Sequence, residues 1–109
     1  MIAAALSPVM LAACAPTVVP AGEKAAPPRL TGDKYVAADG TALPLAVWPT
    51  KGAPPKTIIL GLHGFGDYRD AFEEPAKVWS KDGITTYAFD QRGFGQSPSR
   101  GRWPGTNTL

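Results

Sequence analysis

Apolar residues from position 34 onward fall in short runs, and the spacing of these runs predicts strands around one helix. Residues 34–38 and 42–48 are two such runs, separated by Asp39-Gly40. That dipeptide suits a tight hairpin turn because glycine adopts positive φ without steric cost. Residues 57–62 show no polar alternation, as in a central strand that is covered on both faces. We therefore expect an antiparallel hairpin followed by a central strand.

A helix is predicted between this strand and the next. Three apolar side chains recur at helical spacing and share one face: Phe72, Ala76 and Trp79. Pro75 suits the first helical turn, and Gly83 suits a left-handed cap after the last turn. Residues 84–89 are again apolar, so a strand–helix–strand unit with parallel strands is expected. The fold class is therefore α/β.

The amino end has the pattern of an export signal. Residues 1–14 carry no charged side chain, and their apolar run is too short to cross a bilayer as a helix. Leu11-Ala12-Ala13-Cys14 resembles the lipobox of bacterial lipoproteins, in which the cysteine is lipidated. The resemblance implies a membrane anchor on Cys14, on the periplasmic or cell-surface side. The alternatives are a secreted protein with a cleaved, non-lipid signal, and an alanine-rich segment that happens to contain a cysteine.

A proline-rich segment follows the signal. Residues 15–30 contain four prolines among Ala, Val, Gly, Glu and Lys, a composition that disfavours both helix and ladder. We expect a semi-extended tether here and an α/β domain over residues 31–109. This domain is small for an independent core, because short chains bury a smaller share of their surface.

Charge and composition exclude several classes of function. The formal net charge is +2, and basic residues alternate with acidic ones instead of gathering. A nucleic-acid partner is therefore not expected. The sequence holds one cysteine and one histidine, so neither a disulfide framework nor a zinc site of His and Cys ligands can be assembled.

Two glycine-marked loops carry the candidate chemistry. Residues 63–66 (His-Gly-Phe-Gly) follow the first apolar strand, and residues 90–97 (Asp-Gln-Arg-Gly-Phe-Gly-Gln-Ser) follow the second. Ligands of open parallel sheets bind beyond the carboxyl ends of the strands, which is where both loops are placed. Glycine lets the backbone turn sharply and bring an N–H group close to a reacting oxygen.

The two loops, in this order across a helix, resemble a known family. Residues 62–67 and 87–97 are similar to the lysophospholipase and monoacylglycerol-lipase-like branch of the α/β-hydrolases, also described as serine aminopeptidase S33-like. The resemblance extends from about Tyr35 to Trp103. It implies that the hairpin and the parallel unit form the amino-terminal part of an α/β-hydrolase sheet.

The resemblance also implies roles for particular residues. The backbone N–H of Phe65 would be one donor of an oxyanion hole, and His63, Gly64 and Gly66 would support that loop. In the second loop, Asp90 and Arg92 would form a local ion pair or cap backbone groups. Gly93 and Gly95 would allow a tight turn there. His63 is not expected to be the catalytic base, because the base of this family lies after the nucleophile.

The residues present exclude several other kinds of site. Ser97 lacks the flanking glycines of a nucleophile elbow, and no histidine follows it. A dinucleotide fingerprint fails at both loops, because Arg69 and Pro98 stand at its third glycine position. A phosphate-binding Gly-x-x-x-x-Gly-Lys-Ser/Thr motif is missing from the sequence. We therefore expect no cofactor and no metal.

No Gly-x-Ser-x-Gly motif occurs before the sequence stops at Leu109. We therefore expect an amino-terminal fragment of a serine hydrolase that acts on a lipid or other small ester and is inactive by itself. One alternative is different chemistry on the same fold, such as that of a peptidase or an epoxide hydrolase. Another is a lipid-anchored binding module without catalysis.

Overall fold

Five strands and one α-helix make up the part of the chain that the computed structural model describes, which is residues 14–52 and 54–106. The strands are β1 (Arg29–Thr31), β2 (Lys34–Val36), β3 (Ala42–Trp48), β4 (Thr57–Gly61) and β5 (Ile84–Phe89). The helix α1 spans Glu73–Trp79 and is flanked by 3₁₀ turns at Arg69–Phe72 and Ser80–Asp82. Residues 1–13 of the predicted signal, which spans residues 1–14, lie outside the described residues.

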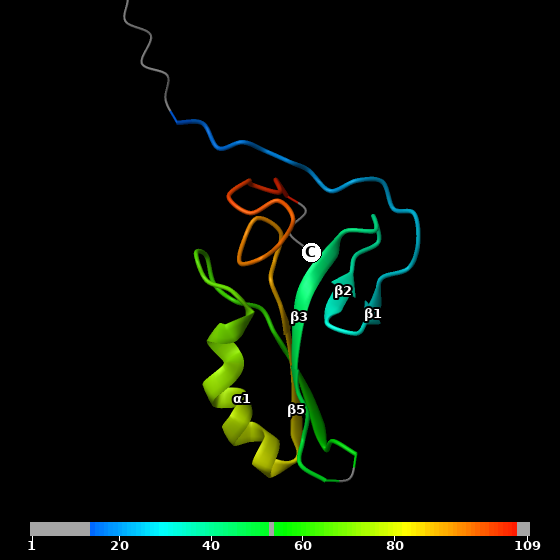
Figure 1. The fold of residues 1–109 in the computed structure, drawn as a ribbon, viewed down its shortest axis with the longest axis vertical. Coiled ribbons are helices and arrows are strands. Elements are labelled where there is room, and N and C mark those ends of the chain that lie inside the picture. The colour runs from blue at the N-terminus through cyan, green and yellow to red at the C-terminus, as the bar shows by residue number, and fades with distance from the viewer. Residues whose placement is uncertain (1–13, 53, 107–109) are drawn as a thin grey trace, which may run out of the picture.

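All five strands form one sheet in the order β1-β2-β3-β5-β4, which Figure 1 shows with α1 on one side. Strands β1, β2, β3 and β5 pair antiparallel, while β4 and β5 are parallel. This mixed sheet, with its parallel β4–β5 pair joined through α1, confirms the predicted α/β fold class.

The hairpin between β2 and β3 forms as predicted. Tyr35 pairs with Leu43, and Gly40 in the connecting turn has φ +83°. The side chain of Asp39 accepts a hydrogen bond from the backbone N–H of Thr41, which closes the turn on itself. The Gly40 N–H donates to the carbonyl of Ala37 and the Ala37 N–H donates to the carbonyl of Thr41, each at 2.9 Å, so this three-residue turn with its left-handed glycine fixes the register.

The two ends of helix α1 also carry the residues that the sequence predicts there. Pro75 is the third residue of the helix, inside the first turn, where a missing N–H costs nothing. Gly83 ends the helical segment with φ +84°. The α1 side of the sheet is closely packed, since a Cβ on Gly61 would lie 2.8 Å from the ring of Phe72.

Strand β4 differs from the prediction. It was expected to be central and covered on both faces, but among the described residues it is the last strand of the sheet. Ile58 and Leu60 are 63% and 61% exposed, because α1 covers the opposite face only. The core cluster of Leu43, Leu45 and Phe89 instead lies nearer the hairpin, with Tyr35 against Phe89 at 4.8 Å between ring centroids. An exposed apolar edge of this kind favours association with another strand.

The segment predicted as a tether is bound to the domain over much of its length. Strand β1 begins at Arg29 and pairs with β2, although the sequence analysis expects no ladder before residue 31. Val18 forms a parallel bridge with Trp103 in the segment that follows β5, and Figure 1 shows the blue segment passing near the red one. The described part of the chain has no helix with the length and apolar character needed to cross a bilayer.

Candidate active site

The candidate site lies at the carboxyl ends of β4 and β5, where the first loop (residues 63–66) and the second loop (residues 90–97) lie side by side. Because the two strands are parallel neighbours, their ends reach the same edge of the sheet. Gly61 pairs with Ala88, one residue from the end of β5. The topology therefore brings together two loops that are 27 positions apart at their first residues, 63 and 90.

The first loop forms a tight turn around Phe65. The N–H of Asp67 donates to the carbonyl of Gly64 at 3.2 Å, and Gly66 has φ +78°. Positive φ at the third position is what a type II turn requires, and it explains a glycine there. The turn projects the Phe65 side chain outward, where 87% of it is exposed.

The backbone N–H of Phe65 is free of hydrogen-bond partners among the described residues. Its neighbours offer room as well, since a Cβ on Gly64 or on Gly66 would meet no atom within 4 Å. An unpaired N–H in an uncrowded turn is able to donate to an oxygen that approaches from outside. This is the chemistry that the resemblance implies for Phe65.

His63 joins the two loops through backbone groups. Its Nδ1 lies 2.9 Å from the carbonyl oxygen of Gly64, and its Nε2 lies 3.0 Å from the backbone nitrogen of Gln91. A carbonyl can only accept, so Nδ1 carries the proton and Nε2 accepts from the Gln91 N–H. The Gln91 amide in turn donates to the carbonyl of His63 at 2.6 Å. Both ring nitrogens are therefore occupied, which leaves neither available as a base.

Asp90 organises the second loop from a fully buried position. Its carboxylate accepts hydrogen bonds from the backbone N–H groups of Arg69 at 2.9 Å and Gln96 at 2.8 Å. The guanidinium of Arg69 pairs with the same carboxylate. A Cβ on Gly95 would lie 2.3 Å from the Asp90 carboxyl group, so this carboxylate requires glycine at position 95.

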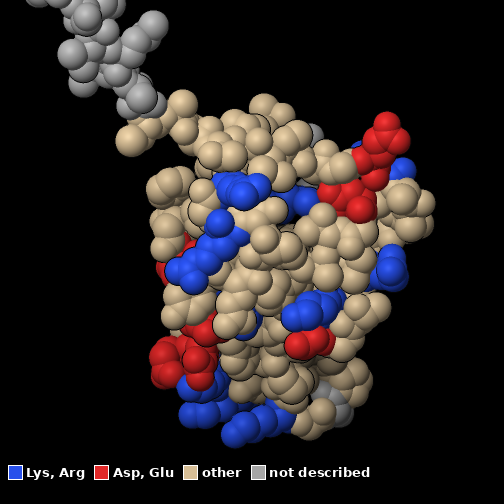
Figure 2. Space-filling model, turned by 45° about the horizontal axis from the view of Figure 1, so that its top comes forward, with Lys and Arg blue, Asp and Glu red and all other residues tan. Residues whose placement is uncertain are grey.

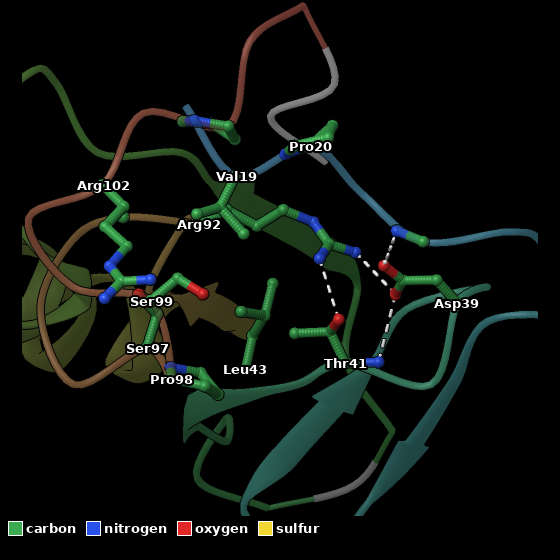
Figure 3. Close-up of a pocket in the computed structure, with 13 residues that line it drawn as sticks. Val19, Pro20, Asp39, Thr41, Leu43, Arg92, Ser97, Pro98, Ser99 and Arg102 are labelled. Carbon is green, nitrogen blue, oxygen red and sulfur yellow. Dashed lines mark hydrogen bonds and ion pairs between the residues drawn. The ribbon is translucent and has the colours of Figure 1, made fainter. Parts of the chain in front are cut away.

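Arg92 does not pair with Asp90 but with the turn between β2 and β3. Figure 3 shows its guanidinium donating to the carboxylate of Asp39 at 2.7 Å and to the hydroxyl of Thr41 at 2.8 Å. Asp39 also accepts from the backbone N–H of Gly22 at 2.8 Å. Its hydrogen bond with Arg92, with further ones from Thr41 and Gly22, holds the pKa of the Asp39 carboxyl well below its usual range. Of the two expected roles, the local ion pair of Asp90 and Arg92 is thus replaced by two separate pairs, whereas the capping of backbone groups is found at Asp90.

The remaining predicted residues have clear positions. A Cβ on Gly93, which has φ +85°, would lie 2.3 Å from the carbonyl oxygen of Arg102, so the chain passes too closely there for any side chain. Ser97 is buried, and its hydroxyl has no hydrogen-bond partner among the described residues. Cys14 is exposed and forms no disulfide with the described residues. Within residues 14–52 and 54–106, no three His, Cys, Asp or Glu side chains gather as a metal site would need.

Sequence reasoning missed most partners of the predicted residues. Arg69, Asp39 and Gln91 were not expected at the site, although Gln91 stands inside the second loop. These three residues are polar and stand in turns, and nothing in the local sequence indicates which distant residue each of them contacts.

On the face that Figure 2 shows, Lys and Arg lie among Asp and Glu, and wide areas carry no charge.

Two comparisons with known proteins bear on this site. The family model described as "Serine aminopeptidase, S33" matches residues 53–109, which include both loops. A Schizosaccharomyces pombe protein named "Putative monoglyceride lipase" is 35% identical over 54 residues. That alignment covers 50% of this chain and 14% of the yeast protein. The chain therefore spans a small part of the length of the relative it matches.

Proposed function

The chain belongs to the serine aminopeptidase S33 family, and we propose that it is the oxyanion-loop portion of a carboxylic ester hydrolase. The substrate class proposed is a monoacylglycerol, a lysophospholipid or a similar small ester. The observation that supports it best is that the N–H of Phe65, in a turn beside the end of β5, has no partner among the described residues. In this proposal, that N–H donates to the oxyanion formed when a serine alkoxide attacks the ester carbonyl.

We also propose that these 109 residues do not hydrolyse esters by themselves. They contain no Gly-x-Ser-x-Gly motif, and their one histidine has both ring nitrogens occupied. The first test is to read the source DNA downstream of the Leu109 codon. An open frame that leads into Gly-x-Ser-x-Gly, followed by an acid and a histidine, supports the proposal. A stop codon there favours a binding module without catalysis.

The oxyanion role is tested by Phe65→Pro in the protein encoded by the complete reading frame. Proline is favoured at the second position of a type II turn, so the loop geometry is retained while the N–H is removed. Loss of one such donor costs about 10²–10³ in kcat. Phe65→Ala is the matched control, because it removes the ring and keeps the N–H. If Phe65→Pro lowered kcat no more than Phe65→Ala does, the assignment would be wrong.

A peptidase is the second candidate, because the matching family model is described as a serine aminopeptidase. The same oxyanion donor serves esters and amides alike, so this site does not separate them. Hydrolysis of p-nitrophenyl esters against aminoacyl p-nitroanilides by the complete protein distinguishes the two. An ester preference in kcat/KM supports the lipase-like proposal, and an anilide preference supports the peptidase.

Lipidation of Cys14 is proposed from the Leu-Ala-Ala-Cys pattern and from the exposed thiol. The carbonyl of Thr17 already accepts from the backbone N–H of Trp103. Three residues span at most about 10 Å, so an acylated Cys14 would hold this end of the domain close to the membrane. Mass spectrometry of the mature amino terminus tests the anchor, and an unmodified Cys14 inside an intact leader contradicts it.

A further inference from the structure

Residues 17–22, which we call the strap, are bound to the domain at both ends. Val18 forms a parallel bridge with Trp103. In this bridge the Trp103 N–H donates to the Thr17 carbonyl and the Val19 N–H donates to the Trp103 carbonyl, each at 2.8 Å. The N–H of Gly22 donates to the buried side chain of Asp39 at the other end. The strap therefore holds both the N–H and the carbonyl of Trp103.

Trp103 lies against the candidate oxyanion turn. Its ring centroid is 6.3 Å from that of Phe65, and Phe65 in turn packs edge-on against Phe94 at 5.4 Å. Aromatic pairs at these separations attract each other beyond their buried area. Trp103 is 39% exposed. Its backbone is bonded to the strap, and its ring lies near that of Phe65.

An open pocket of about 160 Å³ lies among these rings. It is lined by His63, Gly64, Phe65, Gln91, Phe94 and Trp103. The imidazole of His63 has both nitrogens engaged with backbone, so the exposed walls are mainly aromatic. Its volume is comparable to the roughly 150 Å³ of an enclosed apolar cavity that holds benzene, but this pocket opens to solvent on the side of Phe65. The pocket therefore fits a compact apolar group beside the Phe65 N–H.

We propose that the strap is a positioning element of the site, and that Trp103 is a specificity-determining residue whose indole the strap holds as the outer wall of this pocket. The pocket would accept a short acyl or an aryl group of the substrate in preference to a bulky polar one. This inference rests on the proposed function for its substrate class. The amino-terminal segment thereby becomes part of the site instead of a spacer.

The experiment uses benzene as the probe and the protein encoded by the complete reading frame, labelled with ¹⁵N and ¹³C. Titration followed by NMR is expected to shift the Phe65 and Trp103 signals, and nuclear Overhauser contacts are expected between the two rings. Val19→Pro removes the N–H that bonds to Trp103, whereas Val19→Ala keeps it and serves as the control. We expect Val19→Pro to lose the ring contacts and to weaken benzene binding about three- to tenfold, the range that one aromatic contact contributes.

A second variant covers the case in which Val19→Pro disturbs the whole fold. Trp103→Leu removes the indole and leaves both backbone hydrogen bonds possible, so the Val19 N–H is expected to stay protected from hydrogen exchange while benzene binding weakens. The proposal is overturned if wild-type protein shows no benzene response at these rings, or if Trp103→Leu binds benzene within twofold of wild type. These readouts do not depend on hydrolysis. The absence of esterase activity can therefore be distinguished from the absence of benzene binding.

Discussion

The two loops at the carboxyl ends of β4 and β5 use their polar atoms in opposite ways. In the first loop, the Phe65 N–H has no partner among the described residues and the Phe65 side chain points to solvent. In the second loop, the buried Asp90 carboxylate satisfies two backbone N–H groups and one guanidinium. Among the described residues, the first loop leaves a backbone donor without a partner, whereas the second loop uses its carboxylate to hold the backbone in position. Substitutions in the two loops should therefore affect different properties.

The largest effect on stability is expected from Asp90→Ala. The change leaves the Arg69 guanidinium and two N–H groups without their buried acceptor, which typically costs about 3–5 kcal/mol. Urea denaturation followed by circular dichroism measures it. Asp70→Ala is the control, since Asp70 faces the same Arg69 at 3.7 Å from an exposed position and its loss should cost less than about 1 kcal/mol. Equal costs for the two variants would contradict the scaffold role of Asp90.

Alanine at the two loop glycines sharpens the comparison. Gly95→Ala is expected to cost about 2–4 kcal/mol, because strain at φ +53° adds to the clash with the Asp90 carboxyl group. Gly66→Ala meets only the strain at φ +78°, since no atom lies near its Cβ, and should cost about 1–2 kcal/mol. Chemical denaturation of both variants checks the order. The reverse order would show that the first loop is the more closely packed.

A smaller effect concerns acid stability at the Asp39–Arg92 pair. Because the pKa of Asp39 is lowered in the folded protein, its stabilising contribution is present above the ordinary Asp pKa of about 3.9. It is lost as pH falls from there through the lowered folded pKa. Asp39→Asn should flatten this part of the curve of unfolding free energy against pH. Asp33→Asn, on an exposed side chain, should leave the curve unchanged. If the unfolding free energy of Asp39→Asn fell with decreasing pH as steeply as that of the wild type, the pairing would be contradicted.

Local patterns predicted the elements that depend on nearby residues. The turn at Gly40, the position of Pro75 and the left-handed Gly83 follow from steric limits within a few residues, and they appear as expected. The parallel pairing of β4 with β5 follows from the strand–helix–strand order. The two loops could therefore be located before any tertiary structure was considered.

The partners inside the site could not be predicted in this way. Arg92 is 53 positions from Asp39, and Asp90 is 21 positions from Arg69. The order β1-β2-β3-β5-β4 inserts β5 between β3 and β4, which brings the end of β5 to the turn that precedes β3. No pattern in residues 15–28 indicates that residues 17–22 bind Trp103, because their bonds use backbone groups that every sequence offers.

By itself, the sequence determined where the chain turns after β2 and after the helix, which runs form β2 to β5, and that two glycine loops follow parallel strands. These features depend on steric preferences and apolar periodicity within short stretches of chain. Only the tertiary structure decided which carboxylate holds which guanidinium, and that the strap reaches Trp103. Those choices depend on which strand ends become neighbours, since hydrogen bonds and ion pairs form only between groups that the sheet brings within about 3 Å of each other.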